Sequence, residues 1–225
     1  WCFKMKASKL LEVKYIDIDG DSKIEKISLI GHISDENSSY IESLELVIEK
    51  HTTINKVFKI PFKGYSPKLF ICNLFEIYKN QILIIGQYTN IKEFGILRIY
   101  NYNNDNLDLL VDDETLAIQI NCYATLEESN KILVSCLESN KRFIVDINEK
   151  KHDKFTPIVS DISVIHPIIN PFESFYSLQI HQNVLYASNL DIIATLETIV
   201  SIDEKGRSTI KNQSLLQYGN FINKK

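Results

Sequence analysis

The stretch Tyr15–Gly31 reads YIDIDGDSKIEKISLIG and combines the two features that decide the fold. Its two ends are short apolar runs of strand character, and between them carboxylates alternate with other residues around Gly20. Oxygen ligands at such spacing, bent around a flexible glycine, suit a hard cation and above all Ca²⁺. The predicted ligands are the side chains of Asp17, Asp19, Asp21 and Glu25 and the backbone carbonyl of Lys23.

Two interpretations of this acidic loop remain open. In the first, a calcium ion with a structural role is bound, because acids that converge without a cation repel one another. In the second, the loop is an Asp-Gly turn between two strands with solvated carboxylates, which is a common arrangement. An EF-hand is excluded, because its bidentate Glu belongs at the twelfth loop position, here Ser28, and no helical pattern flanks the loop.

The strand pattern of this stretch returns along the chain, with polar turns between short apolar runs and no long segment of helical period. The second strand of each set aligns at Ile27, Ile82, Ile132 and Val184, at intervals of 55, 50 and 52 residues. Such a period is typical of a propeller blade of four strands. The sequence therefore predicts a single all-β domain, a β-propeller of four or five blades built from four-stranded antiparallel repeats. The repeats are residues 10–66, 67–113, 114–165 and 166–225.

The third and fourth repeats are predicted strand by strand from the same pattern. Leu116–Leu126 opens the third repeat as a strand, and Phe155–Val159 closes it. Phe175–Ile180 and Asn183–Ser188 are predicted as two successive strands of the fourth repeat. A four-stranded sheet cannot bury both faces alone, so we expect neighbouring repeats to cover one another.

The stretch YIDIDGDSKIEKISLIG resembles the repeat of FG-GAP/VCBS-type β-propellers. In that family an apolar strand leads into a DxDGD loop, then an acid, then a strand that often ends in glycine. Gly31 and Gly86 match that glycine, whereas Ser135 and Cys136 stand in its place in the third repeat. The acidic ladder is present in the first repeat and lost in the others. The resemblance implies a propeller fold, a calcium loop and a binding or scaffolding role outside the cytoplasm.

Composition and charge exclude several classes of protein. The net charge of -4 gives no general attraction to phosphate backbones, so nucleic acid is not an expected partner. No apolar run reaches the roughly 20 residues of a membrane-spanning helix. The length of 225 residues suffices for a substantial core in one all-β domain.

Four cysteines are present, and none forms a CxxC pair, so a zinc site is not expected. Cys72 and Cys122 each lie in an apolar strand and align in the predicted register. We therefore predict that both are buried free thiols, in sheets about 10 Å apart and too distant from each other for a disulfide. A disulfide is the alternative interpretation. The other two cysteines are Cys2 and Cys136.

No catalytic constellation is evident, because the histidines are scattered and no HExxH or GxSxG motif accompanies them. Asp112-Asp113-Glu114 is predicted as a solvated turn, with a second cation site as the alternative. The aromatic residues of the second repeat are expected to fill the space between sheets, with a carbohydrate or peptide platform as the alternative. The histidines are His32, His51, His152, His166 and His181, and the aromatic residues are Tyr65, Phe70, Tyr88, Phe94, Tyr100 and Tyr102.

These observations together predict a non-enzymatic binding or scaffolding protein with a structural calcium loop. A bacterial exported or surface location is expected, because extracellular calcium is high enough to fill modest sites. The expected partner is a protein or a carbohydrate. Two other classes remain open: a carbohydrate-active enzyme on a propeller scaffold, and an accessory domain of a larger envelope complex.

Overall fold

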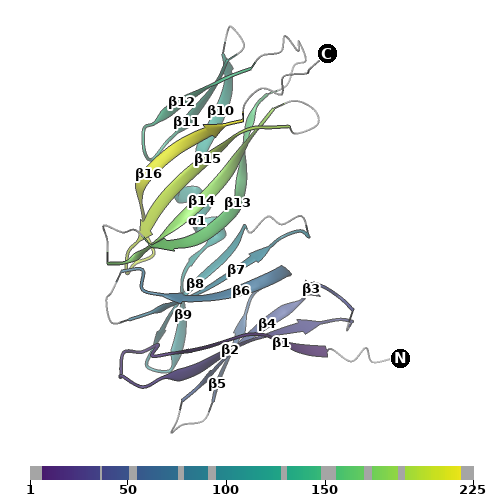
Figure 1. Ribbon diagram of the computed structural model, residues 1–225, viewed down its shortest axis with the longest axis vertical. Coiled ribbons are helices and arrows are strands. Elements are labelled where there is room, and N and C mark those ends of the chain that lie inside the picture. Colours follow the sequence, from purple (N-terminus) through teal and green to yellow (C-terminus); the bar gives the residue numbers. More distant parts are fainter. Residues whose placement is uncertain are drawn as a thin grey trace.

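The computed structural model describes residues 7–35, 37–50, 55–75, 79–90, 95–127, 131–147, 156–169, 174–186 and 191–218. Within these ranges the protein is all-β, as the sequence predicts, with four antiparallel sheets and one short helix (Figure 1). We number the sheets in the order in which the chain enters them. The prediction of four strands in every sheet is wrong, because the sheets contain four, five, three and four strands.

The first two sheets occupy the N-terminal half of the chain. The short strand β3 (Tyr40–Ile41) lies in the chain between two strands of the first sheet but pairs with β6 (Gly64–Cys72), so it is the fifth strand of the second sheet. The first sheet has the strand order β1 (Ala7–Ile16), β2 (Glu25–Ile33), β4 (Ser43–Glu49) and β5 (Lys56–Ile60). The second sheet has the order β3, β6 (Gly64–Cys72), β7 (Gln81–Gln87), β8 (Ile96–Asn103) and β9 (Asn106–Asp112).

The third and fourth sheets differ from the prediction in how the chain is divided between them. The expected strand Leu116–Leu126 is instead α1 (Asp113–Gln119) followed by a strand from Cys122. Val159 belongs to the first strand of the fourth sheet, and Phe155 lies outside the described residues. The third sheet comprises β10 (Cys122–Glu127), β11 (Lys131–Cys136) and β12 (Arg142–Asp146). The fourth comprises β13 (Ile158–Ile169), β14 (Tyr176–Tyr186), β15 (Asp191–Ile202) and β16 (Ser208–Gln217). The prediction of two successive strands at Phe175–Ile180 and Asn183–Ser188 is wrong, because β14 runs unbroken from Tyr176 to Tyr186.

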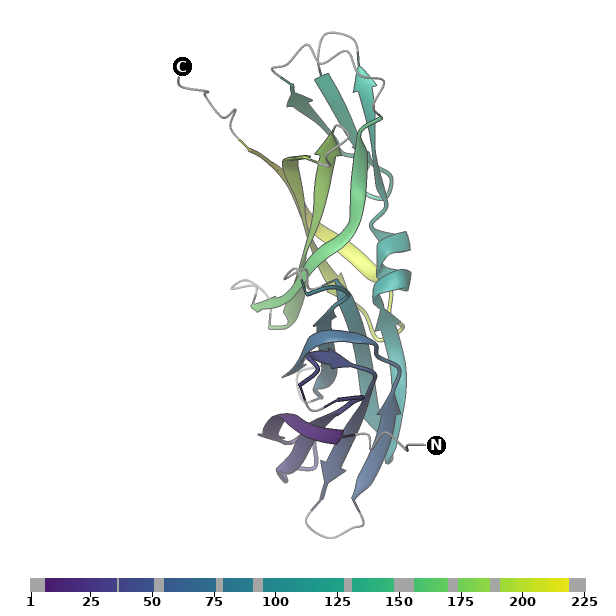
Figure 2. The same ribbon diagram turned by 90° about the vertical axis from the view of Figure 1, so that its right-hand side faces the viewer.

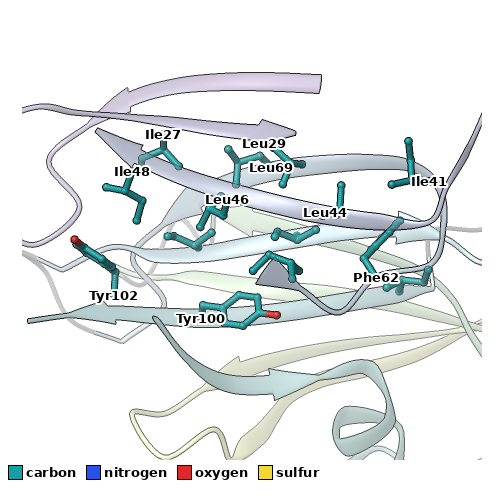
Figure 3. Packing of buried hydrophobic residues seen from close by; sticks show 14 of the residues in the cluster. Ile27, Leu29, Ile41, Leu44, Leu46, Ile48, Phe62, Leu69, Tyr100 and Tyr102 are labelled. Carbon is teal, nitrogen blue, oxygen red and sulfur yellow. The ribbon is translucent and has the colours of Figure 1, made fainter. Parts of the chain in front are cut away.

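The second sheet is buried on both faces, and its central strand β7 shows this most clearly. Every residue of β7 is buried. Ile82 and Ile84 point into a core shared with the first sheet, whereas Leu83 and Ile85 point into a core shared with the fourth. Because both faces are covered, the strand is a continuous apolar run rather than an alternating one. Figure 3 shows the first of these cores, with Leu46 and Tyr100 contributed by facing sheets.

The fourth sheet spans two neighbours with a single face. Residues of β14 that share this face divide between two cores, with Leu178 and Ile180 packed toward the second sheet and Val184 and Tyr186 toward the third. Strands of up to 12 residues make this reach possible. α1 runs from the second sheet to the third along one side of the molecule (Figure 2).

Gln213, Thr198 and Ser139 form a polar seam between the two cores that the fourth sheet shares with the second and third sheets. Gln213, 3% exposed, donates from Nε2 to Thr198 Oγ1 at 3.0 Å and accepts at Oε1 from the Ser139 hydroxyl at 2.5 Å. Buried amides require such partners, because an unpaired polar group in a core is destabilising. The polar seam therefore links β16 of the fourth sheet to the turn between β11 and β12 of the third.

The sheets do not follow one another around a ring in chain order. The first and third sheets lie at opposite ends of the molecule, and the buried clusters of the described residues join first to second, second to fourth and fourth to third (Figure 1). The propeller arrangement is thus not confirmed, while the all-β class is.

Candidate metal centre

The acidic loop joins β1 to β2 and is organised by its own carboxylates. Asp17 accepts the Gly20 amide at 2.7 Å through Oδ1 and the Ser22 amide at 2.8 Å through Oδ2. Gly20 and Ser22 have positive φ angles of 80° and 66°, which bend the chain tightly enough for these contacts. The left-handed conformation is natural for glycine and strained for serine, so the hydrogen bonds of Asp17 hold the turn.

The next two acids repeat this use of backbone amides. Asp19 accepts the Asp21 amide at 3.3 Å, and Asp21 accepts the Lys23 amide at 2.8 Å. Ligand oxygens of Asp17, Asp19 and Asp21 all lie within 4.8 Å of one another. Three of the five predicted ligands are therefore brought together in a geometry that can hold a metal ion.

Glu25 is not among the carboxylates that converge within 4.8 Å. Glu25 is the first residue of β2, is 2% exposed and accepts the Ile18 amide at 3.0 Å through Oε2. Burial raises its pKa, and the three aspartates add to the effect. Lys23 approaches the cluster through its ammonium, 3.4 Å from Asp21 Oδ2, as well as through its amide.

Lys50, which the sequence analysis did not single out, is the basic partner of the loop. Its Nζ lies 2.7 Å from Asp19 Oδ2 and 3.2 Å from Asp105 Oδ1, and 5.1 Å from the centre of the Tyr102 ring. Burial opposes the charge of Lys50, but the hydrogen bonds to the two aspartates outweigh it and raise the pKa. Lys50 follows β4, which pairs with β2 beside the loop, so strand pairing was the signal that could have identified it.

The acids at the loop outnumber the lysines that contact them. With every group ionised, five acids face three lysines, which leaves a net formal charge of -2. A divalent cation would neutralise this excess, and carboxylate oxygens are the ligands that Ca²⁺ prefers. The acids are Asp17, Asp19, Asp21, Glu25 and Asp105, and the lysines are Lys23, Lys50 and Lys56.

The predicted solvated turn Asp112-Asp113-Glu114 is instead the start of α1. Asp112 caps the helix by accepting the Thr115 amide at 2.8 Å. Asp113 is 5% exposed and is held by the Arg98 guanidinium, the Tyr88 hydroxyl and the Leu97 amide. A carboxylate at this depth needs such partners, so this acid has a structural role.

The other candidate residues are dispersed. His32 is 3.4 Å from Glu45, and His181 is 3.5 Å from Glu197 on a different sheet, so these histidines share no site. Tyr100 and Tyr102 are buried in the core between the first two sheets, as expected for aromatic residues that fill inter-sheet space. His51, His152 and Phe94 lie outside the described residues.

The cysteines correct one prediction and agree with another. Cys72 is a buried free thiol, and burial raises its pKa to about 12, so the reactive thiolate is scarce at neutral pH. Cys122 is paired with Cys136 in a disulfide, with their Cα atoms 4.1 Å apart. The Leu137 amide donates to the Asn121 carbonyl, which makes Cys122 and Cys136 the adjoining non-hydrogen-bonded pair, whose side chains lie closest.

The comparisons with protein-family models, curated proteins and solved structures find no match to this chain. No helix in the described part of the chain is long and apolar enough to cross a membrane. The candidate metal centre therefore stands on its own geometry.

Proposed function

We propose that this protein is a non-enzymatic binding or scaffolding protein, exported in a bacterium, in which the loop between β1 and β2 binds a structural calcium ion. The convergence of Asp17, Asp19 and Asp21 within 4.8 Å carries the proposal. The other two predicted ligands, Glu25 and the carbonyl of Lys23, would complete the set only if Glu25 turned from the Ile18 amide toward the ion. The ion would tie together the two strands on either side of the loop, next to the inter-sheet contact made by Lys50.

Two further aspects of the proposal concern location and ancestry. The disulfide between Cys122 and Cys136 supports export, because disulfides persist in oxidising compartments and are rare in the cytosol. The recurring strand sets and the acidic loop support a relationship to propeller repeats of the FG-GAP/VCBS type. We propose that the partner binds where two sheets meet at the surface rather than at the calcium ion, because the proposed calcium ligands all come from one loop.

Calcium-dependent melting tests the proposed site. A ligand that binds only the folded state stabilises it by about 2.7 kcal/mol at 100 times its dissociation constant. Chelation should lower the melting temperature, and added Ca²⁺ should restore it. The double variant Asp19→Asn/Asp21→Asn should lose this response, and its ion-free form should melt no higher than the ion-free parent protein, because Asp19 loses its ion pair with Lys50 and Asp21 its ion pair with Lys23.

Asp146→Asn is the matched control, because Asp146 is an exposed acid at the end of β12, far along the chain from the loop. This variant should keep the full calcium response. Calorimetry that detects no calcium binding up to millimolar concentrations would leave the loop as an Asp-Gly turn in which Lys50 pairs with Asp19, and the proposed calcium role would be wrong.

A further inference from the structure

A cleft of about 420 Å³ lies where the second and fourth sheets meet. Its lining comes from three separate segments: the end of the second sheet after β6, the chain entering β14, and the hairpin of β15 and β16. We propose that this cleft binds a sugar ring of a carbohydrate ligand. The inference rests on the binding role proposed above and gives it a ligand class.

The walls of the cleft are held in place by hydrogen bonds that do not involve a ligand. The Tyr176 amide donates to the Asn73 carbonyl at 2.9 Å, and Asn73 Nδ2 donates to the Ser174 carbonyl at 3.1 Å. The Leu74 amide donates to Gln81 Oε1 at 2.7 Å. A site whose shape is fixed in advance loses less conformational entropy on binding.

The hairpin wall is fixed in the same way and presents no uncompensated acid. Asp203 accepts the amides of Lys205 and Arg207, each at 2.9 Å, through Oδ1. Its other oxygen accepts Arg207 Nε at 2.7 Å. Because the Asp203 carboxylate is engaged within its own turn, it does not select for a cationic ligand.

The remaining groups that line the cleft require a ligand with one apolar face and several hydroxyl groups. The half-buried rings of Phe75 and Phe175 supply the apolar lining, whereas Leu74 and Ile202, each 2% exposed, belong to the core behind the cleft. The polar lining includes the hydroxyl side chains of Ser174, Ser201 and Thr209, together with Lys211, which has an interaction partner of its own. Ser201 and Thr209 are direct cross-strand partners, so they lie on the same face of the sheet.

A pyranose ring matches this combination. Its C–H face packs on aromatic and aliphatic side chains, and its hydroxyl groups exchange hydrogen bonds with serine and threonine, which both donate and accept. The volume also lies within the range of small-molecule sites. An aromatic side chain of a peptide would fill the apolar part but would leave most of the hydroxyl lining without partners.

Amide NMR of the full chain tests this inference with a panel of methyl glycosides of glucose, galactose, mannose and N-acetylglucosamine. At least one glycoside should cause saturable shifts at the amides of Phe75, Phe175 and Ser201. Thr209→Trp should fill the cleft and weaken that binding at least tenfold, and Ser201→Ala should weaken it severalfold. Thr125→Trp is the matched control, because Thr125 is also an exposed strand residue and lies on the third sheet.

Loss of binding in Thr209→Trp with retention in Thr125→Trp supports the site. Absence of shifts for the whole panel at tens of millimolar would overturn it. Saturable binding of p-cresol in the cleft without any glycoside binding would overturn the ligand class in favour of a peptide aromatic side chain. The calcium response is measured separately at the loop, so failure at the cleft leaves that test unaffected.

Discussion

The second sheet is covered on both faces, whereas the third sheet is covered on one. The second sheet lies between two others, and the side chains of β7 point alternately into two cores. The third sheet has three strands and one covered face, so Tyr123 and Ile144 remain exposed on the other. The Cys122–Cys136 disulfide lies in this less covered sheet. The comparison indicates that the sheet with fewer buried apolar side chains is the one that has a disulfide.

The largest expected effect comes from truncating the doubly covered strand. Ile84→Ala removes a fully buried side chain from the core between the first two sheets and should cost about 2–5 kcal/mol of unfolding free energy. Ile144→Ala, at a position 60% exposed on the third sheet, should change stability by less than about 1 kcal/mol. Urea denaturation of both variants measures the difference, and equal losses would contradict the proposed contrast.

Removing the disulfide should have an effect of intermediate size and local extent. The double variant Cys122→Ala/Cys136→Ala opens a link between residues 14 apart, which chain entropy values at about 3 kcal/mol. Hydrogen exchange should accelerate in β10–β12 and change little in β7, because the core around β7 does not include either cysteine. Cys72→Ala, which removes a buried thiol but no disulfide, is the control for the loss of a cysteine side chain. Uniform acceleration across both sheets would show that they unfold as one unit.

The polar seam offers the smallest and sharpest test. Gln213→Met keeps the side-chain length but removes the hydrogen bonds to Thr198 and Ser139, so we expect a loss of about 1–3 kcal/mol. The third sheet should then exchange its amides faster than the second. Gln217→Met, which removes an exposed amide that donates to the Asp146 carbonyl, should be close to neutral. A larger loss of unfolding free energy for Gln217→Met than for Gln213→Met would show that the third and fourth sheets are not coupled mainly through Gln213.

The sequence identified most of the strands but not their arrangement. The apolar run Ile82–Ile85 identified a strand, and the acidic loop placed a turn between β1 and β2. Which sheet covers which depends on contacts between distant segments, and a period of about 50 residues does not encode that order. The sharing of one face of the fourth sheet between two cores was therefore not foreseeable from the repeat.

Two misses had local signals. Asp112, followed by two acids and an apolar position at Leu116, is a helix-start pattern, and the alternation of the following residues obscured it. Cys122 and Cys136 lie on strands that were predicted as neighbours, but a shift of one residue in register would have separated them. At the metal centre the three aspartates were predictable from spacing, whereas Lys50 required the pairing of β2 with β4.

The long fourth sheet has a consequence for the order in which the protein is made. The first and second sheets can form their shared core as soon as β9 leaves the ribosome, because every residue of that core precedes Asp112. The other two cores need β13–β16, which are synthesised after the strands of the first three sheets. Until β13–β16 emerge, one face of the second sheet and the covered face of the third are exposed together. The nascent chain therefore carries two apolar surfaces that require the same later sheet, which makes chaperone protection most valuable while β13–β16 are being synthesised.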